Sequence, residues 1–307
     1  MQKDYGECIF MKQSRKIGFA VIACVYILAA ALGIVLFRFF SNLHIFTAVL
    51  IADAGATAIV FLAGVLLSNA TVYDPYWSVA PPIVLTGLAL IQERMHYGTL
   101  LLLIAVWYWG VRLTYNWAYT FRNLNTQDWR YDNFKFRFPR AFQLISFLGI
   151  HMFPTLVVYL CMLPGITLIE ADSSNALASL GFLICIGAAT LQMIADRQMH
   201  RFRRGHAGEN KIIRSGLWKH SRHPNYLGEI MMWWGVYFMM LSASPGTWYL
   251  CLGPLVNTLM FLFISIPMAD KRNRDRRPGF AEYSNETNRL LPFRFPKNNG
   301  HCPRGKP

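Results

Sequence analysis

Long uncharged apolar runs are the feature of this sequence that most restricts its fold. No charge occurs in residues 17–37, 141–169, 175–195 or 230–269. A helix needs about 20 such residues to cross the ~30 Å hydrocarbon core of a bilayer. The last run contains 40 residues, enough for two crossings, with a break at residues 242–246, where Pro and Gly interrupt it. The sequence therefore predicts an integral membrane protein with several spanning helices.

Three more apolar runs complete the predicted bundle. They are residues 45–73, 78–91 and 98–121, and the first and third each contain one charged residue. All the runs together predict an all-α, multi-spanning transmembrane bundle of about eight spans. We expect residues 1–296 to form one integral membrane domain. Residues 297–307 are polar and of low complexity, which predicts a disordered tail.

The distribution of basic residues predicts how the bundle is oriented. The 30 Lys and Arg give a net charge of +14, and all but three lie in residues 1–16, 122–140, 196–224 and 270–307. With eight spans these four segments fall on one side of the membrane. Lys and Arg concentrate in cytoplasmic loops, so we expect both termini to be cytoplasmic. The membrane would be the endoplasmic reticulum in a eukaryote or the inner membrane in a bacterium.

This pattern also restricts the possible partners. Because the basic residues lie between apolar runs, the charge indicates membrane topology and contact with membrane lipids rather than nucleic acid. The six Cys form no CxxC pair, and the eight His have no acid or Cys partners at ligand spacing, so no metal site is predicted. We see no sign of an obligate protein partner.

One stretch combines basic, polar and apolar residues in a way that indicates chemistry. Residues 214–223 are basic, and Pro224 then occupies a position typical of a first helical turn. Asn225 and Glu229 are one helical turn apart and share a face. An acid at membrane depth is costly and often functional. The alternatives are a helix cap for Asn225, an interfacial aromatic position for Tyr226 and a structural ion pair for Glu229.

Two basic segments are candidates for binding an anion. Residues 196–224 and 270–283 either contact lipid headgroups or form two walls of a phosphate-binding pocket, since Arg binds phosphate in a bidentate geometry. In the other half of the chain, Asp74 and Arg112 are either a turn residue and a snorkelling cation or part of the same site. Asp53 is either the partner of such a cation or a group that lines a water cavity.

Several of these segments carry a family resemblance. Residues 222–235, RHPNYLGEIMMWWG, resemble the C-terminal signature of the steroid 5α-reductase family, closest to its less characterised branch of membrane oxidoreductases. The resemblance extends to residues 74–77, 112–117, 128–131 and 270–283. The signature region covers about residues 140–296. The His-Pro core of the motif is shared with isoprenylcysteine methyltransferases.

The resemblance implies an oxidoreductase with a cofactor cavity that opens to the cytoplasm. Such an enzyme uses NADPH to reduce a carbon–carbon double bond of a steroid-like or other lipid substrate within the membrane. The implied catalytic candidates are Glu229, Asp74, Tyr115 and Tyr119. The implied cofactor-binding residues are Asp196, Arg203, Lys211, Arg214, Arg222, His223, Asn225, Tyr226, Arg272, Arg274, Asp275 and Tyr283.

Two other functions are compatible with the sequence. The shared His-Pro core allows an S-adenosylmethionine-dependent membrane methyltransferase, although the many Arg residues favour a cofactor that carries phosphates. A non-enzymatic lipid-binding membrane protein with the same fold is the third possibility.

Overall fold

The computed structural model describes residues 14–292, so the predicted tail at 297–307 lies outside the described residues. Within residues 14–292 the chain is helical and contains no strand. The helices, in chain order, are α2 (Arg15–Phe39), α3 (Ile45–Leu67), α4 (Tyr76–Ile91), α5 (Tyr97–Thr120), α6 (Trp129–Arg137), α7 (Phe142–Ile145), α8 (Phe153–Glu170), α9 (Leu177–Gly205), α10 (Pro224–Leu241), α11 (Leu252–Met260), α12 (Ile266–Arg276) and α13 (Phe280–Glu286).

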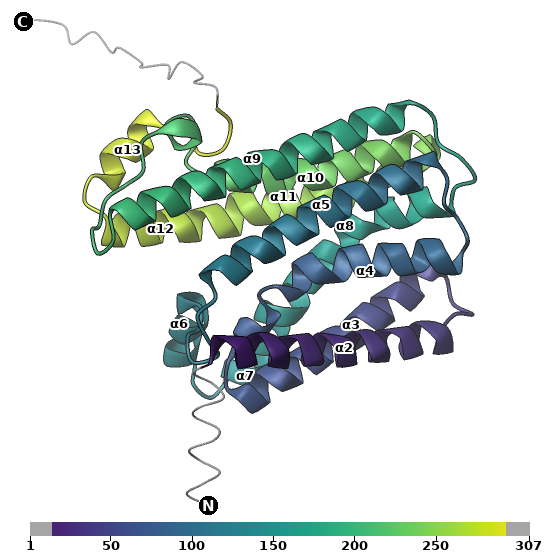
Figure 1. The fold of residues 1–307 in the computed structure, drawn as a ribbon, viewed down its shortest axis with the longest axis horizontal. Helices are drawn as coiled ribbons and strands as arrows, with labels where there is room; N and C mark the ends of the chain where they lie inside the picture. The colour runs from purple at the N-terminus through teal and green to yellow at the C-terminus, as the bar shows by residue number, and fades with distance from the viewer. Residues whose placement is uncertain (1–13, 293–307) are drawn as a thin grey trace, which may run out of the picture.

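Short helical segments of other types connect several of these helices. They are the 3-10 helices η1 (Ala70–Tyr73), η3 (Gly216–Lys219) and η4 (Pro245–Cys251), and the π-helical segments η2 (Ser146–Met152) and η5 (Phe261–Ser265). The long helices run along the bundle axis, and α6 and α13 lie at one end of it (Figure 1). The predicted helix start at Pro224 is confirmed, and α10 ends at Leu241, directly before the predicted break.

Six helical segments in the described part of the chain are long and apolar enough to cross a membrane. They are α2, α3, α5, α9 and the continuous segments Phe142–Glu170 and Pro245–Arg276. The two other predicted spans correspond to α4 and α10, which have 16 and 18 residues. At 1.5 Å per residue these helices are ~24 and ~27 Å long, a little short of the ~30 Å core. The structure therefore supports an integral membrane protein with six candidate spans, while the prediction of about eight is not confirmed.

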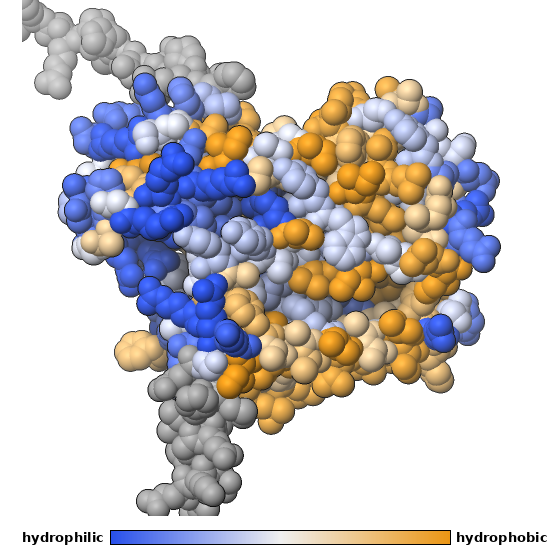
Figure 2. Space-filling model, in the orientation of Figure 1, coloured by the Kyte–Doolittle hydropathy of each residue, from blue (hydrophilic) through white to orange (hydrophobic). Residues whose placement is uncertain are grey.

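The polar and apolar surfaces of the molecule are separated along the bundle axis. Hydrophilic residues gather at the end where α6, α12 and α13 lie, and hydrophobic residues cover much of the rest of the visible face (Figure 2). We call this end the basic end, because three segments rich in Arg lie there: the loop that leads into α6, the C-terminal end of α9 and the C-terminal end of α12. Arg94 pairs with Asp172 in the loops at the opposite end. The separation by charge that the sequence predicted is thus present in the fold.

Helices α9 and α10 have the most extensive contact of any two helices in the described bundle (Figure 1). Gly181 and Gly235 allow the two backbones to approach, because a Cβ on Gly181 would lie 2.6 Å from the Met239 nitrogen and 2.7 Å from the Gly235 carbonyl oxygen. Small residues at membrane helix interfaces permit this kind of packing. The contact fixes how the polar residues at the basic ends of both helices face one another.

We predict that Gly181→Ala destabilises the bundle by about 1–3 kcal/mol, because the methyl group would press on backbone atoms that cannot move aside. Gly187→Ala is the matched control on the same helix, since a Cβ at Gly187 meets nothing within 4 Å. Thermal unfolding in detergent should show a lower midpoint for Gly181→Ala and an unchanged or higher one for Gly187→Ala. Equal midpoints for the two variants would contradict this account of the packing.

Candidate functional site

A buried carboxylate lies where α5, α9 and α10 meet. Glu229 on α10 is 6% exposed, and three N–H groups donate to its two oxygens. Trp109 Nε1 and Gln192 Nε2 donate to Oε2 over 2.9 and 3.0 Å. Trp233 Nε1 donates to Oε1 over 3.2 Å. Carboxyl oxygens accept hydrogen bonds, so all three of these buried N–H groups are satisfied by Glu229. Glu229 is therefore an organising residue around which two indoles and an amide are fixed.

Gln192 connects Glu229 to an ion pair nearer the basic end. Its amide oxygen accepts a hydrogen bond from Arg112, and Arg112 Nη1 also donates to Asp196 Oδ2 over 2.8 Å. The Asp196 carboxylate in turn hydrogen-bonds with the Asn225 side chain. Gln192 and Asp196 are one turn apart on α9 and therefore share a face. The structure thus brings together Glu229, Asp196 and Asn225 with Arg112, for which the sequence also allowed a snorkelling position, and it adds Gln192. We call these five residues the central network.

A second buried ion cluster joins the start of α10 to α12 and α13. His223 Nε2 lies 2.8 Å from Asp270 Oδ1, and Arg222 Nη2 donates to Asp270 Oδ2 over 3.0 Å. Arg222 Nη1 donates to the carbonyl oxygens of Ser284 and Thr287 over 2.7 and 2.9 Å. Arg222 and His223, both predicted to bind cofactor, thus hold the C-terminal helices of the described chain against α10.

Two predicted tyrosines pack beside this second cluster. The Tyr226 ring stacks on His223 with a centroid separation of 5.1 Å and an interplanar angle of 7°. The Tyr283 hydroxyl donates to the carbonyl oxygen of Trp218, which links α13 to η3. Burial raises the pKa of Tyr283 to about 12, so this hydroxyl keeps its proton at physiological pH. Both tyrosines fix segments of the basic end relative to α10.

Arginines from two helix ends gather near the central network. The guanidinium of Arg272 on α12 lies 4.4 Å from the ring centroid of Trp129, the first residue of α6. Arg203 on α9 interacts electrostatically with both Arg272 and Arg277, and Asp128 is the acid next to Arg272. Burial and then the positive charge of Arg203 lower the pKa of Arg277. We call Arg203, Arg272 and Arg277 the arginine cluster. Such mutually repelling cations are suited to a multiply charged anion.

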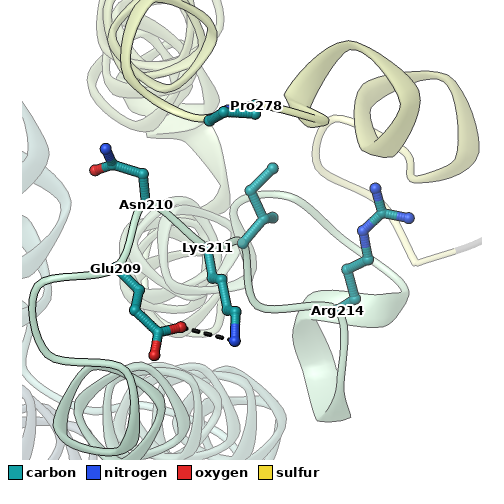
Figure 3. A pocket seen from close by; sticks show the side chains of 6 residues that line it. Glu209, Asn210, Lys211, Arg214 and Pro278 are labelled. Atoms are coloured by element: carbon teal, nitrogen blue, oxygen red, sulfur yellow. Dashed lines mark ion pairs between the residues drawn. The ribbon is translucent and has the colours of Figure 1, made fainter.

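Lys211 and Arg214 lie further out, at an open recess on the surface (Figure 3). Lys211 pairs with Glu209 over 2.7 Å, and Arg214 pairs with Glu282 and Glu286 of α13 over 2.9 and 3.3 Å. The recess has a volume of about 530 Å³ and is lined by Glu209, Asn210, Lys211, Ile212, Arg214 and Pro278. Both cations are thus directed toward acids of their own chain at the rim.

Four other predicted residues lie outside the central network. Arg274 and Asp275 are exposed on α12. Tyr115 and Tyr119 are 70% and 42% exposed on α5. The Tyr119 ring packs against His200 with a centroid separation of 4.8 Å. A helix face that is this exposed in a membrane bundle contacts lipid or the interface, so neither tyrosine is placed beside Glu229.

Asp74 lies at the basic end, between η1 and α4. It accepts a hydrogen bond from the Tyr131 hydroxyl over 2.7 Å, which connects it to α6. Burial raises the pKa of Asp74 from 3.8 to about 7, and the hydrogen bond from Tyr131 opposes that shift. Asp74 therefore titrates close to neutral pH and helps to hold α6 in place.

Asp53 and Tyr76 form a buried acid–tyrosine pair. The sequence pointed to Asp53 but not to its partner. The Tyr76 hydroxyl donates to Asp53 Oδ1 over 3.0 Å, and the two residues are 7% and 6% exposed. Asp53 was detectable as an acid within an apolar run, but its partner depends on how α3 packs with α4. The next residue, Trp77, packs against Trp109 with ring centroids 6.2 Å apart. Aromatic rings thus connect this pair to the Glu229 site.

Comparison with known protein families identifies the family of this chain. Residues 60–287 match a family described as "Protein of unknown function (DUF1295)", and this region begins in the last third of α3 and extends through α13. The chain belongs to the DUF1295 family. The matched region contains the central network, the second ion cluster, the arginine cluster and Asp74, whereas Asp53 lies just before it. The family description names no activity.

One curated relative was found for this DUF1295 chain. An uncharacterized protein of Schizosaccharomyces pombe is 23% identical over 218 residues. The match covers 60% of this chain and 60% of that protein, so less than two thirds of the relative's length is spanned. No solved structure matches the chain.

We predict that Asp74 makes the stability of the protein fall as the pH rises from about 4 to about 7. Its pKa is raised from 3.8 to about 7 in the folded state, so the folded protein binds more protons than the unfolded chain in this window. Asp74→Asn retains an oxygen that accepts from Tyr131 but removes the titration. Melting temperatures of both proteins across this pH range should converge at the acidic end and diverge in favour of Asp74→Asn toward pH 7. Parallel curves would show that Asp74 does not titrate in this window.

Proposed function

We propose that this protein is an NADPH-dependent reductase that acts on a carbon–carbon double bond of a steroid-like or other lipid substrate within the membrane. The observation that carries the proposal is the contact between the arginine cluster and the central network, since Arg203 interacts electrostatically with Asp196. An anion-binding site next to buried amide, carboxylate and indole groups suits a cofactor with phosphates at one end and a planar amide at the other.

The residues at the basic end fit such a cofactor. Arg203, Arg272 and Arg277 would hold phosphate groups, since the two acids that interact with them, Asp196 beside Arg203 and Asp128 beside Arg272, are fewer than the three cations. Asp196 and Asn225 have the donors and acceptors to bind a ribose or the nicotinamide amide. Glu229 would act by fixing Trp109, Trp233 and Gln192, because its own oxygens already accept three hydrogen bonds. The cofactor would supply the hydride.

The Asp53–Tyr76 pair is suited to the substrate side of this reaction. A tyrosine hydroxyl that is hydrogen-bonded to a carboxyl group can donate a proton to a carbonyl oxygen, which is what reduction of an activated double bond requires. The pair is buried among apolar side chains, so a lipid could reach it without passing through water. Trp77, which follows Tyr76, packs against Trp109, and Trp109 donates to Glu229.

The proposed topology follows the distribution of charge. We propose that α4 and α10 also cross the membrane, which gives eight crossings in the described chain. The basic end would then face the cytoplasm, where Lys and Arg concentrate and where NADPH is available. A methyltransferase is less compatible with the site, because S-adenosylmethionine carries no phosphate for the arginine cluster to bind.

We predict that purified protein in detergent binds NADPH, measured by calorimetry, and that Arg203→Gln weakens binding. Loss of one charge-assisted contact of about 1.5–3 kcal/mol corresponds to roughly a 10- to 100-fold weaker affinity. Arg201→Gln is the matched control, because it removes the same charge from the same helix two residues away, on a different face. Absence of NADPH binding by the wild-type protein, or binding of S-adenosylmethionine instead, would contradict the proposed function.

A further inference from the structure

A chain of buried hydroxyl groups leads away from the Asp53–Tyr76 pair. Thr57 lies one turn after Asp53 on the same face of α3, and its side chain hydrogen-bonds with Tyr76. Thr57 Oγ1 is 3.0 Å from Thr155 Oγ1, and Thr155 Oγ1 is 2.8 Å from the Tyr73 hydroxyl. The chain thus joins groups from α3, α4, α8 and η1 in one series of hydrogen bonds.

These groups are enclosed within the bundle. Tyr73, Thr57 and Thr155 are 2%, 0% and 3% exposed. Each hydroxyl can donate one hydrogen bond and accept others at the same time. A row of such groups can therefore pass a proton along by exchanging donor and acceptor roles. The alternative is a structural role, in which Thr57 and Thr155 only pack α3 against α8.

A buried histidine lies at the outer end of the row. The His151 ring is 0% exposed and lies 4.8 Å from the Tyr73 ring, measured between centroids. His151 Nδ1 is 2.8 Å from the Ser146 carbonyl oxygen, which requires the proton on Nδ1 and leaves the lone pair on Nε2. His151 Nε2 makes no hydrogen bond to any residue that the structure describes. This nitrogen is an acceptor without a partner in the protein, which has a cost unless water or a proton reaches it.

A small polar cavity borders His151. It has a volume of about 60 Å³, enough for more than one water, and it is lined in part by Gly64, Asn69, Gln127 and Ser146. Ser146 is the residue that binds His151 Nδ1. A Cβ built on Gly64 would lie 3.8 Å from His151 Nε2, so this side of the ring faces the glycine that lines the cavity. Lys135 of α6 also lines the cavity, which places it at the basic end.

We propose that His151 and the hydroxyl groups of Tyr73, Thr155 and Thr57 form a proton inlet that reloads the Tyr76–Asp53 pair from water at the basic end. The inference rests on the proposed function, because it assigns the source of the proton that the reduction consumes. A dry site within a membrane needs such a path, since its proton donor has no direct contact with water.

The proton balance of one turnover is simple. Reduction of one double bond takes a hydride from NADPH and one proton. The hydride forms a C–H bond, and the O–H bond of Tyr76 breaks as its proton moves to the substrate. Tyr76 then takes a proton from Thr57, Thr57 from Thr155, Thr155 from Tyr73, and Tyr73 through His151 from water in the cavity. Every residue ends as it began, and one proton has left the aqueous side.

The first test interrupts the row without removing its volume. Thr155→Val replaces the hydroxyl with a methyl group. Thr99→Val is the matched control, because Thr99 is buried as well, at 0% exposed, but its hydroxyl has no partner among the described residues. Rapid-mixing measurements of NADPH oxidation would use progesterone as the probe enone. In Thr155→Val we expect a first turnover at the wild-type rate and later turnovers slowed on the order of tenfold or more. The solvent deuterium isotope effect should rise with this slowing.

Thr155→Ser should restore the wild-type behaviour, because it restores the hydroxyl. A purely structural role predicts instead that Thr155→Val lowers the melting temperature while all turnovers keep the same rate and isotope effect. Equal slowing of the first and later turnovers would also overturn the proposal, since the loaded Tyr76 does not need the inlet for its first proton.

A second test does not depend on activity. Transfer of the protein to D₂O should exchange the O–H groups of the Tyr76–Asp53 pair, followed by infrared spectroscopy and assigned with Tyr76→Phe and Asp53→Asn. We expect slower exchange in Thr155→Val and His151→Phe, and wild-type exchange in Thr99→Val. Unchanged exchange in all variants would overturn the inlet. Slowed exchange in a protein that oxidises no NADPH with the probe would retain the inlet and reject the proposed reaction.

Discussion

The burial of charge inside an apolar bundle is the constraint on which the rest of this structure depends. A carboxylate at membrane depth is stable only when donors satisfy its oxygens, and Glu229 obtains three of them from α5, α9 and α10. Satisfying Glu229 fixes the rotamers of Trp109 and Gln192. Gln192 then positions Arg112, and Arg112 positions Asp196. One electrostatic requirement thus orders a polar network from the bundle interior toward the basic end.

The basic end is held together by the same principle. Asp270 accepts from Arg222 and lies beside His223, so the tail helices are fixed to α10 by a buried ion cluster rather than by apolar packing alone. The arginine cluster differs, because its cations lie close to each other. Residues that satisfy one another serve the fold, whereas residues that repel one another indicate a site for something of opposite charge. Arg222 is paired with Asp270, whereas Arg203 lies near two other arginines as well as Asp196, which already pairs with Arg112.

The two halves of the bundle have separate polar interiors. The C-terminal half contains the central network, and the N-terminal half contains Asp53, Tyr76 and the row of hydroxyls that ends at His151. Trp77 and Trp109 lie between them. A reaction that takes a hydride from one side and a proton from the other would use both interiors. The π-helical segment η2 carries His151 near its end, and such segments are frequent at functional sites.

The sequence by itself determined that this is a helical membrane protein, because uncharged runs of about 20 residues have few other stable solutions. It also determined the separation of basic residues and the start of α10 at Pro224. The sequence did not determine the number of spans, because α4 and α10 are only 16 and 18 residues long. Only the tertiary structure decided the partners. Asp53 and Tyr76 are 23 residues apart, and Glu229 and Trp109 are 120 apart. No local pattern connects residues at such separations, so helix packing alone shows which polar groups meet.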